Sequence, residues 1–199
     1  MTGLSERAKE LIPQARIVSF EGWPSLTREG RDRLQTADDN SQYLTDEDLS
    51  IVTERVLSKE RDAKARSIDT IAVVKQLRDQ AADIVDEARA GVLESFPGIL
   101  DPGGGLYPPM RAAACWRDFW QFLRCITYGI AGQQVQYTSA PGLAAMELLY
   151  EELKVPLPAM VKGIEGVKMA SLRRFDLATQ AAIAPYFDHL IAQLSAFLK

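Results

Sequence analysis

One face of a short helical segment carries the side chains that could do covalent chemistry. Cys115, Asp118 and Phe122 are spaced i, i+3 and i+7, and Arg111 lies one turn before the cysteine, so a helix would place all four on one face. That face combines a thiol, a carboxylate, a guanidinium and an aromatic ring. Because a free cysteine usually behaves as a small core hydrophobe, the spacing alone favours a buried cysteine beside a surface ion pair.

Other residues that catalysis or metal binding would need are scarce. The chain has one histidine, His189, and two cysteines, Cys115 and Cys125. A single histidine cannot build a zinc site, and the common pairing of a nucleophile with a histidine base is missing. We therefore predict that the protein is not an enzyme. We expect Cys125, about 80° around the helix from Cys115, to pack in the core, and His189 to be exposed or half-buried.

The composition is that of an ordinary globular domain. Of 199 residues, 47% are hydrophobic and 25% charged, with 23 basic and 27 acidic residues and a net charge of −4. Without a basic block, nucleic acid is an unfavoured partner. The uncharged stretch 125–146 contains glutamines, hydroxyls and Pro141, so we do not expect it to span a membrane. The charged N-terminus does not resemble a secretory signal, and we expect a soluble cytoplasmic protein.

The elements that must position these residues are predicted to be helices. Apolar residues repeat at helical spacing almost throughout, which indicates an all-α fold of six or more helices packed at globin-like angles around one core. Thr45 and Asp48 have the shape of a capping box at a helix start. The predicted helices begin near 45, follow one apolar stripe from 68 to 92, cover 109–131, follow Pro141, begin near Pro158, and start at the N-cap Asp176.

Residues 1–26 differ from the rest. Pro13 and Pro24 break any helix there, so we expect an N-terminal helical extension of uncertain order before a helical domain at 27–199. Its large apolar side chains are Leu11, Ile12, Phe20 and Trp23. An unfolded tail seldom retains so many, and we therefore expect the extension to dock onto its own domain or onto a neighbouring subunit.

The order of the motifs resembles the phycobiliproteins, the bilin-carrying light-harvesting proteins. Their C-x-R-D and L-R-x-x-T-Y patterns match residues 115–118 and 123–128, and their P-G-G-N-x-Y pattern matches residues 102–107 except that Gly105 stands in place of the asparagine. Segments at 37–44, 84–88, 149–156 and 185–188 also look like family segments in the same order. The resemblance covers about residues 27–199 and is nearest to divergent allophycocyanin-like proteins. It implies the globin-like phycobiliprotein fold.

The resemblance also implies a cofactor and its contacts. A linear tetrapyrrole of the phycocyanobilin type would be joined to Cys115 by a thioether, and Asp118 would accept hydrogen bonds from its inner pyrrole N–H groups. Arg111 and Arg117 would bind its two propionates. The aromatic side chains that would wall the pigment are Trp116, Trp120, Phe122 and Tyr128. Aromatic residues at helical spacing are more often core, which is the competing interpretation for these four.

Three functions remain open at this point. The first is a light-harvesting protein that assembles with other phycobiliprotein subunits or with itself, peripheral to the thylakoid membrane, its pigment attached by a bilin lyase. The second is a bilin-carrying light sensor outside the antenna, and the third a pigment-free interaction protein of the phycobilisome. Colour in the purified protein would separate the first two from the third. A haem protein is disfavoured because His189, near the C-terminus, is the single histidine available as axial ligand.

Overall fold

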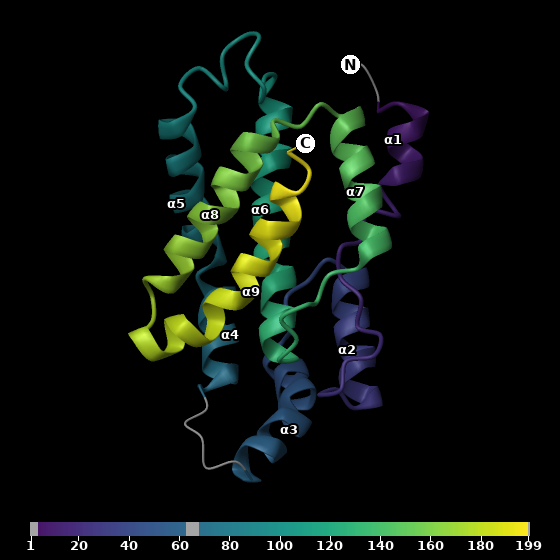
Figure 1. Cartoon of the computed structure of the whole chain (residues 1–199), viewed down its shortest axis with the longest axis vertical. Coiled ribbons are helices and arrows are strands. Elements are labelled where there is room, and N and C mark those ends of the chain that lie inside the picture. Colours follow the sequence, from purple (N-terminus) through teal and green to yellow (C-terminus); the bar gives the residue numbers. More distant parts are fainter. Residues whose placement is uncertain (1–3, 63–67, 199) are drawn as a thin grey trace.

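The computed structural model describes residues 4–62 and 68–198, and in this part of the chain all regular secondary structure is helical apart from one isolated bridge between Val18 and Thr138 (Figure 1). The helices are α1 (Glu6–Leu11), α2 (Arg28–Asp39), α3 (Asp46–Asp62), α4 (Thr70–Asp79), α5 (Ala81–Ser95), α6 (Pro109–Ala131), α7 (Ala140–Glu152), α8 (Leu157–Leu172) and α9 (Leu177–Ser195). Within these ranges no helix is long and apolar enough to cross a membrane.

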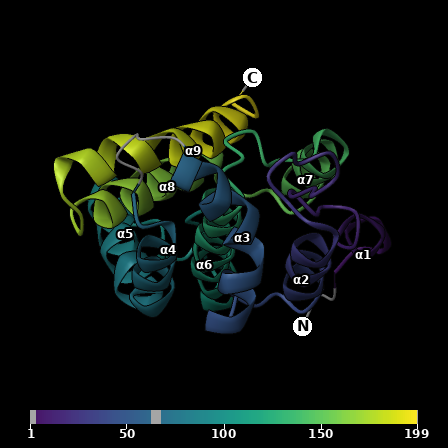
Figure 2. The same cartoon turned by 90° about the horizontal axis from the view of Figure 1, so that it is seen from below.

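Helix α6 is the central element of the fold. Helices α4, α5, α8 and α9 pack around it, and α1, α2 and α7 lie together to one side (Figures 1 and 2). From Phe122 to Ala131 every residue of α6 is buried. The ring of Phe119 lies so close to α8 that a Cβ on Gly163 would sit 1.9 Å from it, so this crossing requires glycine. The all-α, globin-like prediction is confirmed.

Most predicted helices are present. Helix α6 covers the predicted 109–131, and α7, α8 and α9 begin close to the expected residues. At the start of α3 the predicted capping box forms: the Thr45 hydroxyl accepts the Asp48 N–H at 3.1 Å, and the Asp48 carboxylate accepts the Thr45 N–H at 3.1 Å. The N-cap Asp176 accepts the Thr179 N–H of α9 at 2.7 Å.

The prediction of a single helix along the apolar stripe at 68–92 is wrong. It divides into α4 and α5 at Gln80, whose φ of −105° and ψ of 14° are not helical. Arg174, far away in the sequence, donates to the Gln80 side chain at 2.7 Å and accepts from Gln76 at 3.1 Å through its carbonyl. The apolar spacing continues across the break, so the periodicity contains no sign of it.

The N-terminal segment docks onto its own chain. Leu11, Phe20 and Trp23 are buried, whereas Ile12 is 46% exposed. The Trp23 ring packs on the end of α6, where a Cβ on Gly132 would lie 2.5 Å from it. Backbone bonds between residues 17–19 and 137–139 add to this contact. The proposed domain boundary, between residues 26 and 27, stays a prediction.

A buried ion pair ties the following helix to the core. Helix α2 was not predicted from the sequence, because it carries few apolar residues in a polar segment. Asp38 of α2 accepts a bond from Arg124 of α6 at 2.9 Å and one from Arg16 of the N-terminal segment at 2.5 Å. Arg124 also donates to the Tyr128 hydroxyl at 2.6 Å, and that hydroxyl donates to the Gln42 carbonyl. The N-terminal segment, α2 and α6 therefore meet at the carboxylate of Asp38.

This packing predicts that the N-terminal segment contributes to stability. We expect Trp23→Ala to lower the free energy of unfolding by about 3–5 kcal/mol, because the ring is buried against Gly132. Ile12→Ala, in the same segment but half-exposed, should change it by less than about 0.5 kcal/mol. Urea denaturation followed by circular dichroism measures both. Equal midpoints for the two variants would contradict the prediction.

Candidate functional site

The thiol of Cys115 lies inside the protein. Its residue is 5% exposed, and its Sγ atom lies 3.1 Å from Sδ of Met160 in the first turns of α8. Burial, with a smaller contribution from the negative charge of Asp118, raises the pKa of this thiol to about 12. At neutral pH the group is therefore protonated and a weak nucleophile.

Asp118 lies one turn after the cysteine, at the edge of the buried region. Its Oδ2 atom accepts a hydrogen bond from the Tyr150 hydroxyl of α7 at 3.2 Å, and its Oδ1 atom lies 4.0 Å from Arg117. The carboxylate side chain is 31% exposed. Burial raises its pKa to about 6, against the opposing effects of the Arg117 charge and the Tyr150 hydrogen bond. Both protonation states are thus accessible near neutral pH.

Arg111 binds backbone rather than solvent. Its guanidinium donates to the carbonyls of Gly105 at 3.1 Å, Leu153 at 2.9 Å and Lys154 at 2.7 Å. The last two are carbonyls at the C-terminal end of α7, which no further turn of helix satisfies. Arg111 therefore fastens the end of α7 to the loop that precedes α6.

The chain then turns sharply between α7 and α8. Lys154 has a φ of 51° and its N–H bonds to the Glu151 carbonyl at 3.1 Å, while the Val155 N–H bonds to the Tyr150 carbonyl at 2.9 Å. These two bonds form a Schellman motif, which ends a helix and reverses the chain. We call residues 153–156 the α7–α8 connection. The connection leads into α8, whose Met160 lies against the Cys115 thiol.

Two of the predicted aromatic residues, Trp116 and Trp120, are half-buried on other faces of α6 than Cys115. Trp116 packs its ring 5.6 Å from that of Phe119 and under the Arg89 guanidinium, also 5.6 Å from the ring centroid. Trp120 meets the ring of Tyr43 edge-on at 4.7 Å. Each could contact a ligand on its exposed side, and each already stabilises the helix packing.

The remaining predicted residues lie deeper. Phe122 is a buried core residue. Tyr128 is also buried and stands thirteen residues after Cys115, roughly 20 Å along the helix axis, where it belongs to the Arg124 cluster. Cys125 packs in the core, as predicted. His189, half-buried as predicted, has its Nε2 atom 2.8 Å from the Thr138 hydroxyl.

The structure therefore assembles part of the predicted set. Cys115, Asp118 and Arg111 lie on α6 and contact Met160 of α8, Tyr150 of α7 and the α7–α8 connection respectively, whereas Tyr128 lies in a separate cluster. Tyr150 and Met160 complete the site, and neither was predicted from the sequence as a site residue. The resemblance had included Leu149-Tyr150 among its matching segments, which was the available signal.

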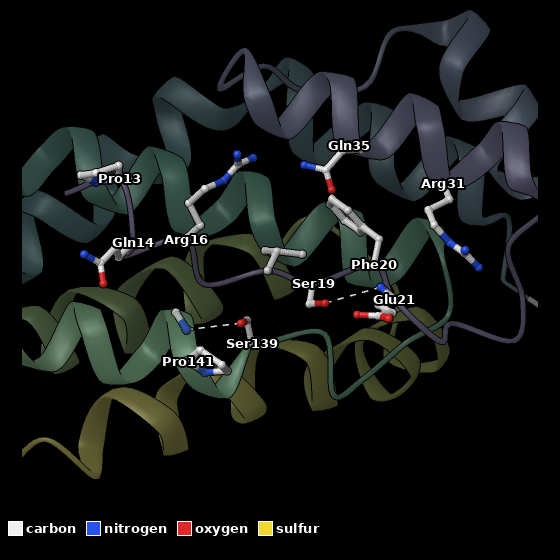
Figure 3. Close-up of a pocket in the computed structure, with 12 residues that line it drawn as sticks. Pro13, Gln14, Arg16, Ser19, Phe20, Glu21, Arg31, Gln35, Ser139 and Pro141 are labelled. Atoms are coloured by element: carbon white, nitrogen blue, oxygen red, sulfur yellow. Dashed lines mark hydrogen bonds between the residues drawn. The ribbon is translucent and has the colours of Figure 1, made fainter. Parts of the chain in front are cut away.

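A metal site and an open cavity are the two alternatives to the Cys115 site. Among the described residues, no group of three or more His, Cys, Asp or Glu side chains could hold a metal ion. An open cavity of about 610 Å³ lies between the N-terminal segment, α2 and the start of α7, lined by Arg16, Phe20 and Pro141 among others (Figure 3). Its lining does not include Cys115 or Asp118.

The fold and the site define a class: a globin-like all-α protein with a thiol and a carboxylate one turn apart on its central helix. A model of the family described as "Phycobilisome protein" matches residues 32–194, and the chain belongs to this family, the phycobiliproteins. Similar proteins are the allophycocyanin subunit alpha-B of Nostoc sp., 31% identical over 80% of this chain and 94% of the relative, and the allophycocyanin alpha-B chain of Synechococcus sp., 32% identical over 78% and 90%. The alpha-B chain of Cyanidium caldarium is 31% identical over 80% and 93%.

The raised pKa of Asp118 predicts a pH-dependent stability. Because the folded pKa of about 6 exceeds the unfolded value near 3.8, the folded state binds this proton more tightly, and stability falls as pH rises from about 4 to about 6. Asp118→Asn removes this loss. We expect the variant to gain roughly 1–2 kcal/mol relative to the wild type between pH 4 and pH 7, a value reduced for the partial exposure of the carboxylate.

Urea unfolding of both proteins at several pH values measures this difference. The matched control is Asp86→Asn, at an exposed carboxylate of α5. A constant stability difference between Asp118→Asn and the wild type across this pH range would contradict the prediction.

Proposed function

We propose that this chain carries a linear tetrapyrrole of the phycocyanobilin type, bound covalently at Cys115, and absorbs visible light with it. The observation that carries the proposal is the pairing of Cys115 with Asp118 one turn apart on the central helix of a phycobiliprotein fold. Such a pigment, when bound, supplies the visible absorption. The relatives named as allophycocyanins support a role in the light-harvesting antenna.

The residues present fit such a group chemically. Cys115 would hold it through a thioether, formed when the thiol adds across a carbon–carbon double bond of ring A and its proton passes to the adjacent carbon. Asp118, with a pKa of about 6, is mainly ionised above neutral pH and would accept hydrogen bonds from pyrrole N–H groups. An ionised acceptor there favours a cationic pigment.

Arg117 and Arg111 differ in how readily each could bind a propionate of the pigment. Arg117 is 69% exposed and contacts Asp118 only at 4.0 Å, so its guanidinium can also bind a propionate at the rim. Arg111 already donates to three carbonyls, so it could bind a propionate directly only by releasing at least one of them. Trp116, under the Arg89 guanidinium, would form one wall. Phe122 and Tyr128, both buried, would act through packing.

One observation favours a different function. Cys115 is buried against Met160 and its pKa is raised to about 12, which suits a pigment-free interaction protein of the phycobilisome. The same observation fits a pigment protein whose attachment is assisted by a bilin lyase. Partners of the pigmented form would be other phycobiliprotein subunits or a second copy of this chain, peripheral to the thylakoid membrane. A bilin-carrying sensor outside the antenna would be coloured without co-sedimenting with phycobilisomes.

The attachment residue is tested by substitution. With a bilin source supplied during expression, Cys115→Ala should lose covalent pigment, because no other thiol lies on that face of α6. Cys125→Ala, the matched control, should keep it, since Cys125 lies in the core. Zinc-enhanced fluorescence of the denatured band reports both. Fluorescence that persists in Cys115→Ala would refute the assignment, and a colourless wild type would favour the pigment-free function.

The role of the carboxylate is tested separately. Asp118→Asn should retain covalent pigment but lose the counter-charge that stabilises the pigment's cation, so the pKa of that cation falls. We expect the long-wavelength band to weaken as pH rises, at a lower pH than in the wild type. Absorption spectra between about pH 6 and pH 9 measure this. Identical spectra for variant and wild type would mean that Asp118 does not contact the pigment.

A further inference from the structure

The thiol of Cys115 lies directly against a methionine of a neighbouring helix. Its Sγ atom donates a weak hydrogen bond to Sδ of Met160 at 3.1 Å. Met160 lies at the start of α8 and is 1% exposed. Among the described residues, this thioether is the one hydrogen-bond partner of the thiol. The Met160 side chain therefore covers the sulfur atom and favours its protonated form.

The contact between the two sulfur atoms lies near the edge of the core. On α6 the neighbours of Cys115, Ala114 and Trp116, are half-buried, and the Asp118 side chain one turn on is 31% exposed. On α8 the first residue, Leu157, is half-buried as well. Solvent is therefore within about one turn of helix of the thiol on both elements.

The helix that carries Met160 is fixed in position. Helix α8 runs alongside α6, and a Cβ on Gly163 would lie 1.9 Å from the Phe119 ring of α6 (Figure 1). On α5 a Cβ on Gly166 would lie 3.0 Å from Cα of Ala88. Moving α8 outward would open voids along both of these contacts, and protein interiors are close-packed. The part of α8 that can move near the thiol is therefore the Met160 side chain.

A methionine side chain is suited to such a movement. It is unbranched and has three rotatable bonds, whereas a β-branched residue is restricted to few rotamers. Rotation about these bonds would carry Sδ of Met160 away from Sγ of Cys115 while the backbones of α6 and α8 stay in place. Such a local opening requires much less free energy than unfolding the domain.

We propose that Met160 controls access to Cys115, so that the thiol reacts only when the Met160 side chain has rotated away from it. The inference rests on the proposed function, in which Cys115 is the attachment residue, and it names the side chain that regulates that site. With Met160 in place, the thiol is covered and protonated. Rotation of Met160 exposes the sulfur for attachment.

The experiment measures how fast methyl methanethiosulfonate labels each thiol in the folded, pigment-free chain, followed by mass spectrometry. A Cys125→Ala background reports Cys115, and a Cys115→Ala background reports Cys125. In each background Met160→Ala removes the thioether. Ile164→Ala is the matched control, because Ile164 is fully buried one turn further along α8. The measured quantity is the labelling rate of Cys115 divided by that of Cys125.

We expect Met160→Ala to raise this ratio roughly tenfold or more, because the space it opens adjoins Cys115. Ile164→Ala should leave the ratio unchanged, since a loss of global stability exposes both thiols alike. Met160→Leu fills nearly the same volume with fewer rotatable bonds and should not raise the ratio. An unchanged ratio in Met160→Ala, or an equal rise in Ile164→Ala or Met160→Leu, overturns the proposal.

A second variant covers the case in which Met160→Ala does not fold. Met160→Val lacks the sulfur and the terminal methyl but keeps carbon at the γ position, so it leaves a smaller cavity. A raised ratio in Met160→Val supports the proposal, and an unchanged ratio overturns it.

The labelling result is independent of the proposed function. Labelling needs no pigment, so control by Met160 can fail while zinc fluorescence still assigns the pigment to Cys115. Conversely, loss of that assignment leaves the labelling rates unaffected.

Discussion

The fold depends on one carboxylate that is buried and paired on two sides. Asp38 accepts from Arg124 of the central helix and from Arg16 of the N-terminal segment. Removing Asp38 would leave the buried Arg124 guanidinium without a carboxylate, and a loss of this kind costs roughly 3–5 kcal/mol. Because the two arginines come from distant parts of the chain, this requirement fixes where the extension, α2 and the second half of α6 lie relative to one another.

Local signals made most of the helices predictable. Pro109 at the start of α6, the Thr45 capping box and the Asp176 N-cap act on the backbone within a few residues, and sequence alone contains them. At the break between α4 and α5, the Gln80 side chain binds Arg174, which is 94 residues away, and no local pattern records this contact. Helix α2 buries only two apolar side chains, Leu34 and Ala37, beside the charge of Asp38, so its apolar periodicity was too faint to recognise.

The site was predictable only on one helix. Spacing placed Cys115 and Asp118 on a common face, and the structure keeps them there. Met160 and Tyr150 come from α8 and α7, so their approach to α6 is a tertiary contact that spacing cannot give. Tyr128 illustrates the converse. Its motif is contiguous in sequence but extends roughly 20 Å along the helix, so Tyr128 lies in the Arg124 cluster, away from Cys115.

The two halves of α6 therefore differ in how firmly they are held. The second half is buried throughout and anchored by an ion pair, whereas the first half alternates buried and exposed residues and is joined to the end of α7 by hydrogen bonds at Arg111 and Asp118. A thiol needs its thiolate to react, and the burial that protects Cys115 raises its pKa to about 12. Protection and reactivity therefore oppose each other at this thiol.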